Sequence, residues 1–450
     1  MTIANVESRH FGLLAFAAGI FCIQLDAFAL NVALLQIGQD FEVSARWLKW
    51  VVSGYLLSVG TFMLAAGRLS DRFGHLRMLV VGLSLFGVAS GLCGLANSFP
   101  TFLFARLIQG VGGACIMPAG LALLTNIYPV EQRGKAIGLA IGLGGVATAS
   151  GPFIGGSLTQ WFSWRLIFAL NAPLILLALW GCYKAKVWRV HHPQVQRIDM
   201  PGLAMISLTI AILGVLLDEL INRSLDLYVS LSITGLFCVL AISFVLRERR
   251  MSAPLIDLSL FRNRHYVVLS VAGAVANIAT VAHLFIFPLS LQATWNLSPF
   301  DAGMMFLAPT LLLACTGPIA GRVRTNSAVP VMAGCLAAVA FCFITAAYAQ
   351  SLWVFVLIMT LCGGALGVAN ALTLVATQAV VNPDIAGVAS GVTKTLITVA
   401  AGLGVVLSGF AYQQALVVIG LCCLGAFLLL LVWQKRNRVM ITKDDRQRYR

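Results

Sequence analysis

Residues 11–39 read FGLLAFAAGIFCIQLDAFALNVALLQIGQ and contain one charged side chain, that of Asp26. The hydrocarbon core of a bilayer is about 30 Å thick, and an α-helix crosses it with roughly 20 apolar residues. This run is therefore long enough to span a membrane. A carboxylate inside such a span costs about 2.5–3.5 kcal/mol on insertion scales, so it usually serves a function.

Long apolar runs recur along all 450 residues. Hydrophobic residues make up 60% of the chain and charged residues only 10%, whereas soluble domains carry about 25% charged residues. The mean hydropathy is +0.92. The first run is too long for a cleavable signal peptide and lacks a small-residue cleavage site. We expect an all-α polytopic membrane protein with fourteen spans, at residues 11–35, 48–67, 78–97, 101–124, 136–158, 164–183, 200–217, 227–246, 266–291, 301–320, 328–348, 352–378, 386–409 and 412–433.

Basic side chains are distributed unequally between the two sides of the predicted membrane. An even number of spans places both termini on one side, which receives 24 of the 30 Lys and Arg residues. Such an excess marks the cytoplasmic side, so both termini are predicted to be cytoplasmic. The net charge of +14 then faces anionic lipid headgroups and does not indicate nucleic-acid binding. Arg106 and Lys394 lie within spans, and the opposite side holds Arg46, Lys49, Arg165 and Arg223.

Loop lengths divide the chain into blocks of six, two and six spans. The longest loops, at residues 184–200 and 247–265, separate the blocks. We predict an N-terminal six-helix bundle at 1–190, an inserted helix pair at 191–250, a C-terminal six-helix bundle at 251–434 and a basic cytoplasmic tail at 435–450. Blocks of equal size are typical of transporters built from repeats.

The chain lacks the sequence signatures of an ATP-driven pump, an enzyme or a metal site. Its Gly134–Lys135 pair has Pro129 where a phosphate-binding loop needs its first glycine. The 11 cysteines fall in apolar runs without CxxC or Cys/His spacing. We expect no cofactor, no metal and no enzymatic activity. An ion gradient remains as the energy source, and proton coupling requires a group that titrates within the membrane.

Ionisable residues inside the spans are the candidates for that group. Asp26 is the one acidic residue well inside a span, Arg106 lies in span four and His283 in span nine. Burial favours the protonated carboxylate and a nearby cation favours the ionised one, so Asp26 beside Arg106 can exchange a proton. Alternatively, Asp26 forms a permanent pair with Arg106 or Lys394 that only joins helices, and His283 is a packing residue. Lys394 is then either an anion contact or an ion-pair partner.

Several motifs together resemble the major facilitator superfamily. GRLSDRFGHLR (67–77) resembles its loop motif, and LFARLIQGVGGA (103–114) its fourth-helix motif. SGPFIGG (150–156) is similar to the fifth-helix signature of exporters that exchange drugs for protons. Four further stretches resemble sequence motifs of the fourteen-span drug:proton antiporters: LDAFALNVAL (25–34), SWRLIFALNAP (163–173), RIDMPG (197–202) and PLIDLSLFRNR (254–264). The second half of the chain resembles the superfamily in the layout of its spans.

The resemblance implies two six-helix bundles around a central cavity that opens alternately to each side. It implies that the loop motif helps to lock the state closed to the cytoplasm, with Asp71 near the start of span thirteen, where a helix dipole favours negative charge. Topology anchoring by the arginines and tight helix packing by the glycines are the alternative interpretations. The expected gating residues are Gly67, Asp71, Arg72, Gly74, Arg77, Gly151, Pro152, Gly155 and Gly156.

We expect a proton-coupled transporter that exports small amphipathic compounds from the bacterial cytoplasmic membrane. The second half has no acidic residue in the membrane interior, and Lys394 favours the alternative of one endogenous anionic metabolite. A non-transporting sensor on the same fold is a second alternative. The expected partners are substrate and protons; a periplasmic adaptor protein is left open, and a monomer is expected to suffice. Side chains that can line the substrate cavity, or instead hydrogen-bond between helices, are Gln24, Asn31, Tyr55, Gln109, Asn171, Asn277, Asn370, Gln378 and Lys394.

Overall fold

The computed structural model describes residues 6–185, 199–222, 226–251, 255–256, 258–320, 323, 325–381, 386–407 and 412–448, and these are almost entirely helical. The helices of the first half are α1 (Val6–Asp40), α2 (Ala45–Phe73), α3 (His75–Leu95), α4 (Phe99–Ile127), α5 (Val130–Trp161), α6 (Arg165–Ala169) and α7 (Asn171–Ala185). An intermediate pair follows, α8 (Met200–Asn222) and α9 (Leu227–Glu248). The helices of the second half are α10 (Arg264–Ala293), α11 (Pro299–Ala320), α12 (Thr325–Ala346), α13 (Leu352–Ala379), α14 (Ala386–Leu407) and α15 (Tyr412–Arg448).

The number of spans agrees only in part with the predicted fourteen. Within the described residues, twelve helical segments are long and apolar enough to cross a membrane, with α6 and α7 counted as the single segment Arg165–Ala185. A thirteenth is reached if Trp47–Met63 and Ala65–Phe73, which meet at a 46° bend within α2, form one span. The helix α14 begins at the predicted thirteenth span. The chain is a multi-pass membrane protein, and the count of fourteen stays a prediction.

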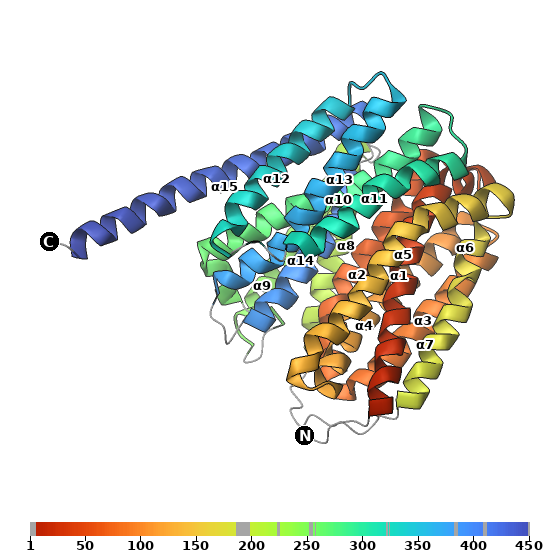
Figure 1. Ribbon diagram of the computed structural model, residues 1–450, viewed down its shortest axis with the longest axis horizontal. Helices are drawn as coiled ribbons and strands as arrows, with labels where there is room; N and C mark the ends of the chain where they lie inside the picture. The colour runs from red at the N-terminus through yellow and green to blue at the C-terminus, as the bar shows by residue number, and fades with distance from the viewer. Residues whose placement is uncertain are drawn as a thin grey trace.

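The helices form two neighbouring bundles, with α8 and α9 at their side. In the first bundle α1 packs against α5 and α7, and α3 against α4. In the second, α13 packs against α11 and α12, and α10 against α14. Figure 1 shows the red-to-yellow first bundle beside the green-to-blue second one. The block boundaries at residues 190, 250 and 434 stay a prediction, and residue 190 lies outside the described part of the chain.

At one end of the molecule the bundles touch closely. The helices α5 and α11 meet through their backbones, since a methyl group on Gly156 would lie only 2.5 Å from the carbonyl oxygen of Pro299. A methyl group on Gly303 of α11 would in turn strike the carbonyl oxygen of Pro152. Nearby, the Gln292 side chain of α10 donates a hydrogen bond of 2.8 Å to the carbonyl oxygen of Val32 in α1. These contacts close the end at which α1 and α5 terminate.

Toward the other end the same helix faces separate. On α5, Gly134, Gly138, Gly142 and Gly145 lie on the face that continues to Gly156. A methyl group on any of these four would meet nothing within 4 Å. The helix α14 also contacts the other bundle at one end only. Val399 contacts Gly60 of α2, whereas a methyl group on Gly391 would enter open space. The bundles therefore diverge toward the end at which α5 and α14 begin.

The inserted pair is fastened at that open end. The Arg247 guanidinium of α9 donates hydrogen bonds to both oxygens of Asp199, at 2.7–2.9 Å. This pairing and the backbone N–H of Gly202 hold the pKa of Asp199 below its usual range, against the opposing effect of burial. Leu203 of α8 and Phe244 of α9 pack with Ala65 of α2. The pair is thus anchored on α2, while α9 exposes most of its apolar side chains.

Candidate functional site

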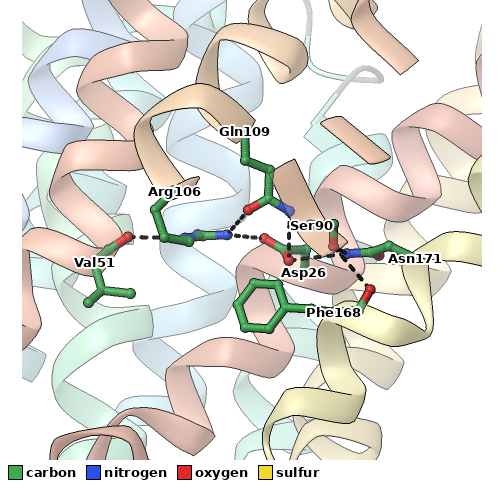
Figure 2. Close-up of polar contacts among 7 residues, drawn as sticks. All are labelled: Asp26, Val51, Ser90, Arg106, Gln109, Phe168 and Asn171. Atoms are coloured by element: carbon green, nitrogen blue, oxygen red, sulfur yellow. Dashed lines mark hydrogen bonds and ion pairs between the residues drawn. The ribbon is translucent and has the colours of Figure 1, made fainter. Parts of the chain in front are cut away.

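The centre of the first bundle holds a buried ion pair. Asp26 lies in the middle of α1 and Arg106 one quarter of the way along α4, and neither is more than 1% exposed. The Arg106 Nη1 atom donates to Asp26 Oδ2 at 2.5 Å (Figure 2). This contact decides between the two partners expected for Asp26, because Arg106 and not Lys394 forms the pair.

Two amide side chains complete the surroundings of the carboxylate. Gln109, one turn beyond Arg106, accepts a hydrogen bond from Arg106 and donates through Nε2 to Asp26 Oδ1 at 3.2 Å. Asn171, at the start of α7, donates through Nδ2 to the same oxygen at 3.2 Å and to Ser90 Oγ of α3 at 2.9 Å. Asp26 therefore receives three donors, from α4 and α7, as Figure 2 shows.

The guanidinium of Arg106 is also fixed on its other sides. Its Nε donates to the carbonyl oxygen of Val51 in α2 at 3.3 Å. It lies 4.4 Å from the ring centroid of Tyr55 and 5.8 Å from that of Phe168, within the range of a cation–π interaction. The break between α6 and α7 lets the Phe168 carbonyl accept from Ser90 at 3.0 Å. The ion pair thereby connects α1, α2, α3, α4 and the α6–α7 segment.

The hydrogen bonds of this arrangement match an ionised Asp26. An ionised carboxylate only accepts hydrogen bonds, and all three donors around Asp26 suit that form. A proton on Asp26 removes the charge that compensates Arg106. Leaving one member of a buried ion pair without its partner costs about 3–5 kcal/mol, so protonation favours any conformation in which Arg106 finds other acceptors.

His283 is placed apart from this network, in the second bundle. It is fully buried in α10, with its ring stacked on Phe287 and edge-on to Phe343. Neither ring nitrogen has a hydrogen-bond partner within the described residues. A histidine in apolar surroundings favours its neutral form. Its surroundings therefore resemble a packing site more than a proton relay.

The remaining polar residues expected around the cavity lie at separate places. Tyr55 and Gln109 belong to the buried ion-pair network. Gln24 donates to Thr148 Oγ1 of α5 at 3.0 Å. In the second bundle Asn277 donates to Asn370 at 3.3 Å, and Asn370 to Thr280 at 2.6 Å. Asn31 is buried with an unpaired side-chain oxygen, and Lys394 lies partly buried on α14.

The expected gating residues also divide by position. Gly156 and Pro152 lie against α11, whereas Gly151 and Gly155 pack against α1 of their own bundle. Gly74, between α2 and α3, has φ of 97°, a conformation that glycine adopts without strain. Asp71, Arg72 and Arg77 are exposed, and Gly67 is partly buried near Pro118. The expected neighbour of Asp71, the start of span thirteen, adjoins residues 382–385 outside the described part of the chain.

Sequence reasoning missed two contributors to the site. Ser90 is a small polar residue within an apolar run, and nothing in its spacing distinguishes it from a packing serine. The carbonyl of Val51 has no sequence signal at all. Asn171 was expected only as a general polar candidate, yet its amide joins Asp26 to Ser90. The first residue of the helix after a break is a useful signal for such a contact.

Comparison with known protein families agrees with this geometry. The family description "Major Facilitator Superfamily" matches residues 16–405 and, in a second match, 269–447. The chain belongs to the major facilitator superfamily. Members of this superfamily are transporters that bind small molecules and are usually monomeric. The resemblance expected from the loop and helix motifs is thereby confirmed.

Individual relatives carry names that refer to transport and resistance. The chain is 32% identical over 413 residues to the multidrug resistance protein Stp of Mycobacterium tuberculosis, covering 88% of this chain and 74% of the relative. It is 29% identical over the same length to the tetracenomycin C resistance and export protein of Streptomyces glaucescens, with the same coverage. It is 31% identical over 318 residues to the riboflavin transporter RibZ of Clostridioides difficile, covering 71% and 68%.

Solved structures support the fold. A mutant of the peptide transporter POT in complex with sulfate superposes with a TM-score of 0.72 at 15% identity, covering 94% of both chains. A bacterial homologue of the human lysosomal transporter Spinster, described as inward-facing and unoccupied, gives a TM-score of 0.65 at 14% identity, covering 95% of this chain and 96% of that one. The all-α prediction with two bundles is confirmed.

Proposed function

We propose that the protein exports small amphipathic organic compounds in exchange for protons, by alternating access between its two bundles. The observation that carries this proposal is the buried Asp26–Arg106 pair with its amide donors, because it places a carboxylate beside a cation at the core of a transporter. The names of the relatives, which refer to multidrug resistance and to antibiotic export, support the substrate class.

Asp26 is the proton carrier in this mechanism. When it is ionised, it pairs with Arg106 and holds α1 to α4. When it is protonated, the pair is lost and Arg106 must turn to other acceptors, which changes the relative stability of the two conformations. A ligand shifts an equilibrium only by its difference in affinity for the two states. Proton and substrate are exchanged if the proton stabilises one conformation and the substrate stabilises the other. Because Asp26 carries the proton in this mechanism, His283 has only a packing role.

The orientation follows from the same proposal. The protein lies in the bacterial cytoplasmic membrane with both termini cytoplasmic, so the end at which the bundles diverge opens to the cytoplasm. Substrate enters there and leaves after the bundles have closed behind it. The basic loops and tail contact anionic lipid headgroups. A monomer carries out this cycle, and the involvement of a periplasmic adaptor protein is left open.

The test compares wild type with Asp26→Asn in everted vesicles that contain a pH-sensitive dye. Wild type releases protons on addition of substrate, whereas Asp26→Asn binds substrate but shows no uphill transport, and Asp26→Glu retains part of it. The matched control is Asp40→Asn on the same helix, where the carboxylate pairs with Arg165 at 3.0 Å at the helix end. This control is expected to transport normally.

Membrane insertion and substrate binding are measured on the same preparation, because Asp26→Asn leaves Arg106 without its counter-charge. Uphill transport by Asp26→Asn with unaltered pH dependence contradicts the assignment of Asp26. A wild-type protein that moves no protons with any compound of a broad panel contradicts the export function itself and points to a sensor.

A further inference from the structure

Lys394 of α14 is a cation of the second bundle that has no partner among the described residues. No hydrogen bond, ion pair or ring contact reaches its ammonium group from the residues that the structure describes. Ala401 and Val405 lie on the same helix face, seven and eleven residues further on, and are 2% and 0% exposed. The face of α14 that carries Lys394 is therefore directed into the protein, and not into the lipid.

The position of Lys394 along α14 coincides with the opening between the bundles. Val399, one and a half turns beyond it, contacts Gly60 of α2, and Gly402 contacts Leu57. Gly391, one turn before it, borders open space. Lys394 thus lies where the two bundles begin to separate, between the closed contact and the mouth. A molecule that enters from the open end reaches it before it reaches the closed end.

The described acidic residues of the interior supply no counter-charge. Asp26 is neutralised by Arg106 and surrounded by amide donors. Asp301, at the start of α11, lies at the closed end and accepts a hydrogen bond from Ser298 at 2.7 Å. The partly buried ammonium group of Lys394 has no anion among the described residues, so the site gains most from an anion that arrives from outside.

We propose that Lys394 binds the anionic group of an amphipathic organic substrate, such as a carboxylate or a sulfonate, at the entrance to the transport path. This inference rests on the proposed export function and adds the charge class of the substrate. The ammonium group donates a charge-assisted hydrogen bond to the anion, and the apolar part of the substrate lies along the diverging helices. A lipid phosphate offers the same chemistry, so the test separates the two sources.

The probes are dansylate, a fluorescent sulfonate, and dansylamide, which has the same ring system without the charge. Binding is measured on full-length protein in nanodiscs of phosphatidylcholine. Wild type binds dansylate more tightly than dansylamide. Lys394→Gln loses about tenfold in affinity for dansylate, which corresponds to about 1.4 kcal/mol, and keeps its affinity for dansylamide. Lys394→Arg retains dansylate binding.

The matched control is Lys435→Gln, which removes the same charge from an exposed position at the end of the α15 span. It leaves both affinities unchanged. Retained dansylamide binding shows that each variant is folded. Equal dansylate affinity in wild type and Lys394→Gln overturns the proposal, as does loss of both probes, because Lys394 then shapes the site without selecting charge.

Nanodiscs that contain phosphatidylglycerol distinguish the source of the anion. Unchanged Lys394-dependent binding supports a soluble organic anion, whereas a loss of dansylate binding greater than that of Lys394→Gln assigns the site to a lipid phosphate and overturns the substrate class.

Failure of the export function gives a different set of results. If dansylate binds through Lys394 but no compound moves protons in vesicles, the export function is wrong and the anion site stands. If dansylamide drives proton release and dansylate neither binds nor moves, export stands and the anion site is wrong.

Discussion

Replacing Gly156 by alanine tests whether the contact between α5 and α11 holds the closed end together. The added methyl carbon would lie 2.5 Å from the carbonyl oxygen of Pro299, whereas ordinary contact begins at 3.4 Å. The obstacle is backbone and cannot rotate away. The two helices must therefore separate by about 0.9 Å, or the closed conformation must give way to another one.

The size of the effect follows from overpacking. Inserting a carbon into a packed contact costs about 1–3 kcal/mol. Because the strain exists only while this end is closed, the full amount acts on the equilibrium between conformations. It changes their ratio by about 5- to 150-fold. The matched control is Gly142→Ala, on the same face of α5, where the methyl group meets nothing within 4 Å.

The assay measures how fast a membrane-impermeant maleimide labels a cysteine introduced at Thr159. This residue lies near the closed end of α5 and is 7% exposed. The exposed native cysteines Cys238, Cys315 and Cys422 are first replaced by serine. Gly156→Ala is expected to speed labelling within the stated range, whereas Gly142→Ala, which meets no neighbour in this conformation, does not speed it. Equal labelling rates for both variants would refute the claim that this contact closes the molecule.

Two further predictions concern other contacts. Asn171→Ala removes one of three donors to ionised Asp26, so the pH midpoint of proton-coupled transport in everted vesicles is expected to move upward. The control is Asn31→Ala, because the amide oxygen of Asn31 has no partner among the described residues. A midpoint that does not move in Asn171→Ala excludes Asn171 from the site. Asp199→Asn removes the pairing that lowers the pKa of Asp199, a contribution present above the unfolded pKa and lost as pH falls through the folded one. The variant therefore melts a few degrees lower than wild type at neutral pH in a thermal unfolding assay, and the difference disappears in acid; a constant difference across pH argues against the ion pair.

The sequence predicted the positions of the helices well, because a membrane span must be long enough to cross the bilayer and apolar along that length. The run around Asp26 became α1, and Arg106 and Asp26 were expected near each other because few ionisable residues lie inside spans. Helix ends were less predictable. The helix α1 extends from Val6 to Asp40, beyond the predicted 11–35, because a helix continues into the headgroup region where composition no longer constrains it.

The geometry of the site was beyond the sequence for a different reason. Which cation pairs with Asp26 depends on how helices pack, and both Arg106 and Lys394 satisfied every sequence criterion. The hydrogen bond from Asn171 depends on the break between α6 and α7, which hydropathy does not register because both segments are equally apolar. The conformation, closed at one end and open at the other, is a property of packing between bundles and leaves no trace in composition.

The glycines of α5 that have no neighbour lower the stability of this helix, and no contact in this conformation offsets the loss. Glycine inside a helix is less favourable than alanine by about 1 kcal/mol, and α5 bears that penalty at Gly134, Gly138, Gly142 and Gly145, where no neighbour approaches. Near Gly156 the same penalty is offset by backbone contact with α11. A helix that is smooth along its whole length can seal against its neighbour at either end in turn. In the proposed alternating-access cycle, the glycines that have no neighbour in this conformation leave room for a close contact at the other end of α5.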